Sequence, residues 1–169
     1  MTQAANQPTD EKMPASPGLP LIIHTQYVKD ISFENPSAPH SMRQGLPAPK
    51  MDLNINLDAR NLDDLKLKDL YEVTIKISAK AMRDGEAVFI AEILYGVAVS
   101  FQDSVPQDQR HPLLMIEVPR LAFPFVRQIM SDLTQGGGFP ALLLGPVDFY
   151  AMYMARFGKE DQPLKEAIN

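Results

Sequence analysis

Apolar and polar residues alternate along two neighbouring segments in the middle of the chain. From Tyr71 to Ala81 the odd-numbered positions are apolar and the even-numbered positions are polar, and from Ala87 to Phe101 the odd-numbered positions are again apolar. A period of two with many β-branched residues is typical of a strand with one buried face. Asp84-Gly85 lies between the segments and tolerates positive φ, so the two strands are predicted to form a hairpin.

The second strand of this hairpin has an unusual outer face. Its even-numbered side carries Val88, Ile90 and Leu94 around a single acid, Glu92, although a solvated face should be polar. Apolar side chains on the outer face of a sheet often mark a contact surface. We therefore expect this face to bind a partner.

Two more strands are predicted upstream of the hairpin. Leu21–Ile31 alternates but is apolar on much of both faces, so it is expected to be paired or covered. Met51–Asp58 alternates cleanly, with its apolar residues at odd-numbered positions. The segment between them, Ser32–Pro49, contains four prolines and is expected to be extended or looped. Asn61–Asp69 is a charged connection between the second and third strands.

The pattern becomes helical in the last third of the chain. Residues 102–112 are polar and are predicted as a loop, and the apolar run 113–118 fits either a strand or a helix. A helix is predicted from Pro119 to the glycines at 136–138, and Asp148 is predicted to cap a last helix that ends near Phe157. The apolar stripe of the first of these helices consists of Phe125, Val126, Ile129, Met130 and Leu133.

Strands followed by helices are the order of an α+β fold. We expect a four-stranded antiparallel sheet with helices packed on one face, formed by residues 21–157. Residues 1–20, rich in proline and polar residues, are expected to be a disordered tail, and residues 158–169 a flexible one.

Composition narrows the possible functions. The chain has 169 residues, a net charge of −5 and no cysteine. The charge argues against nucleic acid or an anionic membrane as the main partner. The absence of cysteine excludes thiol catalysis and disulfides and fits a reducing compartment. No apolar run approaches the roughly 18 residues that span a bilayer, and no export signal is visible, so a cytoplasmic protein is expected.

The sequence shows little sign of catalytic chemistry. Its histidines, His24, His40 and His111, are scattered without the spacing of a metal site. The glycines at 136–138 follow a helix instead of opening one, which favours a helix end over a phosphate-binding loop. We therefore expect no cofactor, and binding is favoured over catalysis.

Several segments resemble one known family. YVKDISFENPSAPH at residues 27–40 resembles the first-strand motif of SecB, the bacterial protein-export chaperone, and PRLAFPFVR at 119–127 resembles its main helix. YEV at 71–73 and FIAEI at 89–93 resemble its later strands. GGFPALLL at 137–144 and PVDF at 146–149 resemble the segment that leads to its last helix. The motifs follow the order of the family, so a SecB-like fold is expected.

The resemblance implies partners and an assembly. SecB proteins are homotetramers, built as dimers of dimers, that hold exported precursors unfolded in the cytoplasm without ATP or metal. They deliver these precursors to SecA, the ATPase of the translocase. In the family, SecA docks on the outer face of the sheet, at positions that match Asp30, Glu34, Ile90 and Glu92 of this sequence. On residue type alone, the three acids also fit ordinary solvated surface groups.

The resemblance also implies a client-binding groove between helix and sheet. The nearest matching apolar positions are Met51, Leu53, Ile55, Phe139, Leu142 and Leu144. The sequence departs from better-known members by having Leu46 where an aromatic residue often sits, and by an insertion at 61–69. This insertion leaves the pairing of the second and third strands open.

Three other functions stay open at this point. A related chaperone that serves a toxin–antitoxin pair would share the fold and the groove, although it need not share the SecA-binding face. An enzyme of unknown type and a purely structural oligomer are the other two. Neither nucleic-acid binding nor insertion into a membrane is expected.

Overall fold

The computed structural model describes residues 20–62 and 69–158, so most of the two predicted tails and of the insertion lies outside the described residues. The predicted α+β class is confirmed, because four strands precede the main helices. The elements are β1 (Leu21–Glu34), η1 (His40–Met42), β2 (Lys50–Leu62), β3 (Leu70–Arg83), β4 (Glu86–Phe101), α1 (Gln107–Pro112), η2 (Leu113–Glu117), α2 (Val118–Gly136) and α3 (Phe149–Phe157).

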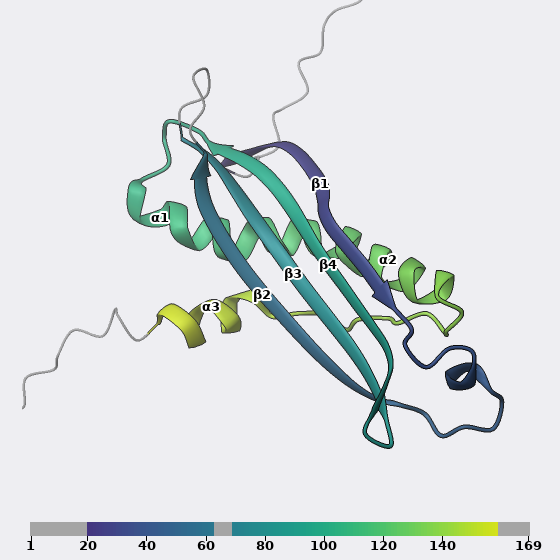
Figure 1. Cartoon of the computed structure of the whole chain (residues 1–169). Coiled ribbons are helices and arrows are strands. Elements are labelled where there is room, and N and C mark those ends of the chain that lie inside the picture. The colour runs from purple at the N-terminus through teal and green to yellow at the C-terminus, as the bar shows by residue number, and fades with distance from the viewer. Residues whose placement is uncertain (1–19, 63–68, 159–169) are drawn as a thin grey trace, which may run out of the picture.

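The strands form one antiparallel sheet in the order β1-β4-β3-β2. The β3–β4 hairpin is confirmed, and Asp84 and Gly85 at its turn adopt φ values of 51° and 85°. The hairpin occupies the centre of the sheet, so β1 and β2 are the edge strands of the sheet. The ladder from Lys50–Met82 to Leu62–Leu70 settles the pairing of β2 with β3. Figure 1 shows α1, α2 and α3 on the same side of the sheet.

The core lies between the hairpin and α2. Ile75, Ile77 and Ile93 are fully buried on the side of the sheet that faces the helices, and Val126 and Met130 of α2 are fully buried with them. Burial of each such side chain contributes about 1.5–3 kcal/mol. Phe125 was predicted to belong to the same stripe but is 53% exposed. It lies one residue, or about 100° of helical rotation, from Val126 and so falls outside the buried arc.

Two bulges interrupt β1. The register passes from Ile23–Val99 to Thr25–Ala98, and from Val28–Tyr95 to Asp30–Leu94, so His24 and Lys29 have no partner in β4. Each extra residue changes the face on which the following side chains lie. The alternation predicted for Leu21–Ile31 is therefore interrupted at both bulges.

Another irregularity changes the outer face of β4. The β3–β4 register shifts between Ala81 and Met82, opposite Val88. Val88 was predicted to lie on the outer face, but it is only 3% exposed and belongs to the core. The bulge accounts for this difference, because it leaves Val88 outside the regular alternation.

The helical region begins earlier than predicted. Gln107–Pro112 forms α1, where the sequence predicted a loop. This helix is short and has no buried residue, so it leaves no apolar periodicity in the sequence. The ambiguous run 113–117 is helical and continues into α2. The predicted cap of α3 is confirmed, because the Ala151 backbone N–H donates to Asp148 Oδ1 at 2.9 Å.

Candidate binding surfaces

The side of the sheet that faces away from the helices carries acids near the end of β1 and the beginning of β4. Glu34 pairs with Ile90 and Asp30 pairs with Leu94, and Glu92 lies between these two β4 positions on the same strand face. Directly opposed residues of an antiparallel pair share a face. The structure thus brings Asp30, Glu34, Ile90 and Glu92 together, and we call these four residues the acidic face.

The members of the acidic face are accessible to different extents. Asp30 and Glu34 are exposed, and Ile90 and Glu92 are half-buried. Lys76 of β3 borders the face, with its Nζ 3.7 Å from Glu92 Oε2. An exposed pair of this kind contributes roughly 0–1 kcal/mol. Among the described residues, the ion-pair partner of Glu92 is this weakly bound lysine, so the Glu92 carboxylate is available to a charged group of another molecule.

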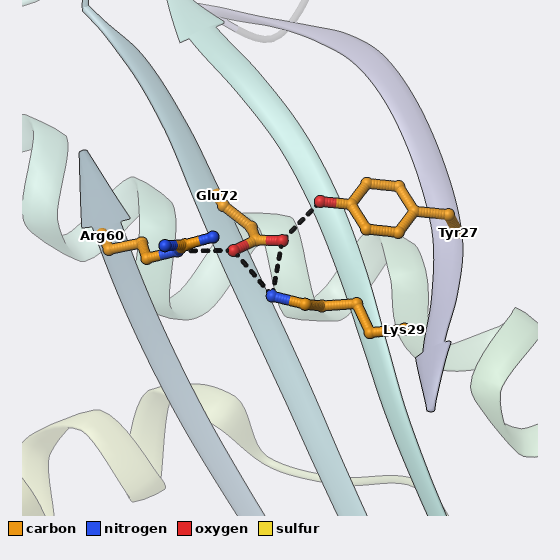
Figure 2. A network of polar contacts seen from close by, with 4 residues as sticks. All are labelled: Tyr27, Lys29, Arg60 and Glu72. Carbon is orange, nitrogen blue, oxygen red and sulfur yellow. Dashed lines mark hydrogen bonds and ion pairs between the residues drawn. The ribbon is translucent and has the colours of Figure 1, made fainter. Parts of the chain in front are cut away.

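Further along the same side of the sheet, Glu72 lies at the centre of a polar network with Tyr27, Lys29 and Arg60 (Figure 2). The Glu72 side chain is only 2% exposed. Lys29 Nζ lies 2.9 Å from each of its carboxylate oxygens, and Arg60 Nε donates to Oε2 at 2.6 Å. The Tyr27 hydroxyl donates to Oε1. The carboxylate thus accepts hydrogen bonds from both edge strands of the sheet.

The local backbone makes room for this network. The Tyr27 ring lies directly over Gly96, where a Cβ would be 2.7 Å from the ring carbon Cε2. Real Cβ atoms do not approach so closely, so any larger residue at position 96 would displace Tyr27 from Glu72. Gly96 is therefore required by the close approach of the ring and not by its own φ.

Burial and hydrogen bonding have opposite effects on the pKa of Glu72. Burial by itself raises this pKa, because it disfavours the charged form. The hydrogen bonds from Tyr27, Lys29 and Arg60 outweigh burial and lower the pKa to about 2. Burial, followed by the hydrogen bond to the Glu72 carboxylate, raises the pKa of Tyr27 to about 12, so its hydroxyl remains a donor over the physiological range.

Sequence reasoning missed Glu72. The alternation of β3 placed it among polar outer-face residues without distinguishing it. It meets Arg60 through the β2–β3 pairing, which the sequence left open, and Lys29 through a bulge. No signal within the sequence around Glu72 indicates either contact.

On the helix side of the sheet, the neighbourhood of η1 and β2 forms an apolar groove. A cavity of about 510 Å³ lies between the segment 41–51 and the segment 138–142. Three of the predicted groove residues, Met51, Phe139 and Leu142, line it together. Met42, Leu46 and Phe89 also line it, and these were not predicted from the sequence. We call this cavity the apolar groove.

The other three predicted groove residues lie elsewhere. Ile55 lines a separate hollow of about 340 Å³ against α3. Leu53 is 45% exposed on the stretch of β2 between Met51 and Ile55. Leu144 is only 5% exposed and belongs to the core, so it lines neither hollow. The sequence could not distinguish Leu144 from Leu142, because both belong to one apolar run.

Within residues 20–62 and 69–158, no group of three or more His, Asp or Glu side chains is arranged to hold a metal ion. In the same part of the chain, no helix has the length and apolar character needed to cross a membrane.

Comparison with known proteins gives consistent matches. The model of the family described as "Preprotein translocase subunit SecB" matches residues 15–160. The "Protein-export protein SecB" of Bartonella bacilliformis is 46% identical over 147 residues, which cover 86% of this chain and 89% of that protein. The protein of the same name from Maricaulis maris is 46% identical over 160 residues, covering 94% of this chain and 88% of that protein.

One solved structure shares the fold at low sequence identity. It is a SecB-like chaperone of Mycobacterium tuberculosis, solved in complex with a ChAD peptide from the HigA1 antitoxin. The TM-score is 0.57 at 13% identity, over 75% of this chain and 87% of that one. At this identity the likeness concerns the fold alone.

The antiparallel sheet, with an acidic face on one side and helices and an apolar groove on the other, defines an α+β protein with surfaces suited to binding other proteins. The family match covers most of the sequence, and two relatives are nearly half identical. The chain belongs to the SecB family.

Proposed function

We propose that this chain is a protein-export chaperone that holds precursor proteins unfolded in the cytoplasm, without ATP, and delivers them to SecA. Membership of the SecB family and the names of its relatives support this proposal. The observation that carries it is the apolar groove, because a cavity of about 510 Å³ with several apolar walls is available to another chain. The SecB family is not known for enzymatic activity, and the proposed function requires none.

Holding a precursor requires no catalytic chemistry in this mechanism. Unfolded precursors expose apolar segments that aggregate, and an apolar groove covers such segments without reading their exact sequence. Met42 and Met51 suit this task, because the flexible methionine side chain adapts to different partners. A homotetramer would present several grooves to one precursor, so weak contacts would add to a tight complex.

Delivery requires a second surface, for which the acidic face is the best candidate. Its acids lie on the side of the sheet opposite the groove, so a client and SecA could be bound at the same time. Like charges placed across an interface slow association, whereas complementary charges favour it. We therefore assign Asp30, Glu34, Ile90 and Glu92 to SecA binding.

The test is the suppression of aggregation of an unfolded precursor by the purified chain. The proposal predicts suppression near one assembled chaperone per precursor, with the same result whether or not ATP is present. A mature protein that is already folded should not be bound, because its apolar segments are buried. Aggregation that proceeds unchanged at a several-fold excess of the chain would contradict the proposal.

A second candidate is a chaperone of a toxin–antitoxin pair. It is favoured by one observation, the shared fold with the M. tuberculosis protein that is seen with an antitoxin peptide. The two functions differ in the use of the acidic face. Binding to SecA that weakens as salt is raised from 50 to 300 mM supports export, since exposed charges are screened within about 10 Å at 0.1 M salt. No measurable SecA binding at low salt would favour the antitoxin role.

A further inference from the structure

The bulge at Lys29 determines which residues of β1 belong to the acidic face. Val28 pairs with Tyr95 and Asp30 pairs with Leu94, so Lys29 is an extra residue between two consecutive pairs. Without the bulge, Lys29 would pair with Leu94 and Asp30 would pair with Ile93. Asp30 would then point into the core side of the sheet.

The same shift applies to the residues that follow. With the bulge, Glu34 pairs with Ile90 on the outer side, and Phe33 points to the core side. There the Phe33 ring stacks on Phe89 with a centroid separation of 5.6 Å. Slippage by one residue would expose Phe33 and bury Glu34. One extra residue therefore aligns Asp30 and Glu34 with Glu92.

Lys29 itself is held by Glu72. Its ammonium lies 2.9 Å from both oxygens of a carboxylate that is 2% exposed, next to the hydroxyl of Tyr27 (Figure 2). Glu72 pairs with Ala98, four residues along β4 from Leu94, and so lies outside the acidic face. Glu72 contacts β1 at Lys29, directly before Asp30 of the acidic face.

We propose that Glu72 is a positioning residue for the acidic face: by holding Lys29 at the bulge, it fixes the register in which Asp30 and Glu34 face a protein partner. This inference rests on the proposed role of the acidic face in SecA binding. It assigns a function to a buried charge that lies outside that face, and it requires no contact between Glu72 and SecA.

The same substitution, Glu72→Gln, can be tested in two parent proteins, the wild-type chain and a chain that lacks Lys29. In the wild-type chain, Glu72→Gln removes the charge that holds Lys29 and should weaken SecA binding by at least about fivefold. In the second, Lys29 is deleted, which removes the extra residue and leaves Val28–Tyr95 and Asp30–Leu94 as directly successive pairs. The acids then keep their face without the bulge, so adding Glu72→Gln to the deletion should change SecA affinity by less than twofold.

Two further variants complete the design. Glu117→Gln, which breaks an ion pair with Arg120 in the helical layer, is the matched control and should bind SecA normally. Lys29→Gln removes the same contact from the other side and replaces Glu72→Gln if that protein does not fold. An equal loss of affinity in both parent proteins, or no loss in the wild-type chain, would overturn the proposal.

Hydrogen exchange separates this inference from the function on which it rests. Backbone amides of residues 30–34 should exchange at least about tenfold faster in Glu72→Gln, and at the rate of the deletion parent in the combined variant. If the wild-type chain binds no SecA, the proposed function fails while this readout still tests the positioning. Unchanged exchange in Glu72→Gln would contradict the positioning role whatever SecA does.

Discussion

Glu72 combines near-complete burial with hydrogen bonds to Lys29, Arg60 and Tyr27. A carboxylate whose folded-state pKa lies below its unfolded value stabilises the fold at neutral pH, and this stabilisation is lost as the pH falls through the folded pKa. A change in the pKa of Glu72 from 4.5 to about 2 corresponds to about 3 kcal/mol of unfolding free energy. We therefore expect the network to stabilise the fold at neutral pH.

The first prediction concerns the pH dependence of that contribution. The unfolding free energy of the wild type should fall relative to that of Glu72→Gln as the pH is lowered from about 5 to about 2, by about 3 kcal/mol. Urea unfolding of both proteins across this range measures the difference, in which the titration of the other acids cancels. A difference that is constant with pH would show that Glu72 has an ordinary pKa.

The second prediction concerns Glu92. Glu92→Lys should change the free energy of unfolding by no more than about 1 kcal/mol, because the ion pair of Glu92 within residues 20–62 and 69–158 is the exposed one with Lys76. Its association with SecA should slow, since the reversal removes a complementary charge. Asp108→Lys, at the exposed start of α1, is the matched control and should associate at the wild-type rate. Stopped-flow association measures both, and equal rates for the two variants would contradict the assignment.

At the residue scale, the sequence predicted which face of the sheet a side chain occupies better than it predicted whether that side chain is buried. The resemblance proposed Asp30, Glu34, Ile90 and Glu92 as one set, and the structure places them on one face; their binding role stays a prediction. Residue type distinguished neither Glu72 from a solvated acid nor Leu144 from Leu142. The first distinction depends on contacts of Glu72 with distant strands, and the second on the burial of Leu144 in the core, and no local pattern records either.

At the scale of elements, the regular strands of the hairpin were predictable because alternation and the Asp84-Gly85 turn indicate the same structure. The bulges at His24, Lys29 and Val88 were not, because a bulge is decided by what the displaced side chains contact. Helix α1 was missed for a related reason. Its polar sequence lacks the periodicity on which helix prediction depends.

The third prediction concerns the segment 139–144. Leu142→Ser should weaken the holding of an unfolded precursor and leave SecA binding unchanged, because Leu142 lines the apolar groove. Leu143→Ser is the matched control, since Leu143 is 75% exposed and does not line the groove. Fluorescence anisotropy of a labelled precursor measures the affinity. Equal affinities for the two variants would exclude Leu142 from client binding.

Leu144 provides the corresponding test of core packing. Leu144→Ala should destabilise the fold by about 2–5 kcal/mol, as expected for a buried leucine. Chemical unfolding measures this loss. A loss below about 1 kcal/mol would contradict the placement of Leu144 in the core.

At the scale of the whole molecule, the edge strand β1 requires a partner or protection. Val28 and Ile31 are 42% and 45% exposed along an edge that runs from Leu21 to Glu34. A long apolar edge is prone to pair with another chain. We therefore expect this edge to be buried between subunits of a homotetramer. Val28→Lys should shift the assembly towards smaller species in sedimentation velocity, and an unchanged sedimentation profile would exclude Val28 from the subunit interface.

The central claim is that this chain holds an unfolded precursor without chemistry, and size-exclusion chromatography with light scattering tests it most directly. The chain should elute with the mass of four copies of its 18.8 kDa monomer. After a precursor is diluted out of denaturant in its presence, the peak should gain the mass of one precursor, with no nucleotide added. A stable monomer at micromolar concentration, or a peak that gains no precursor while the precursor aggregates, would contradict the account.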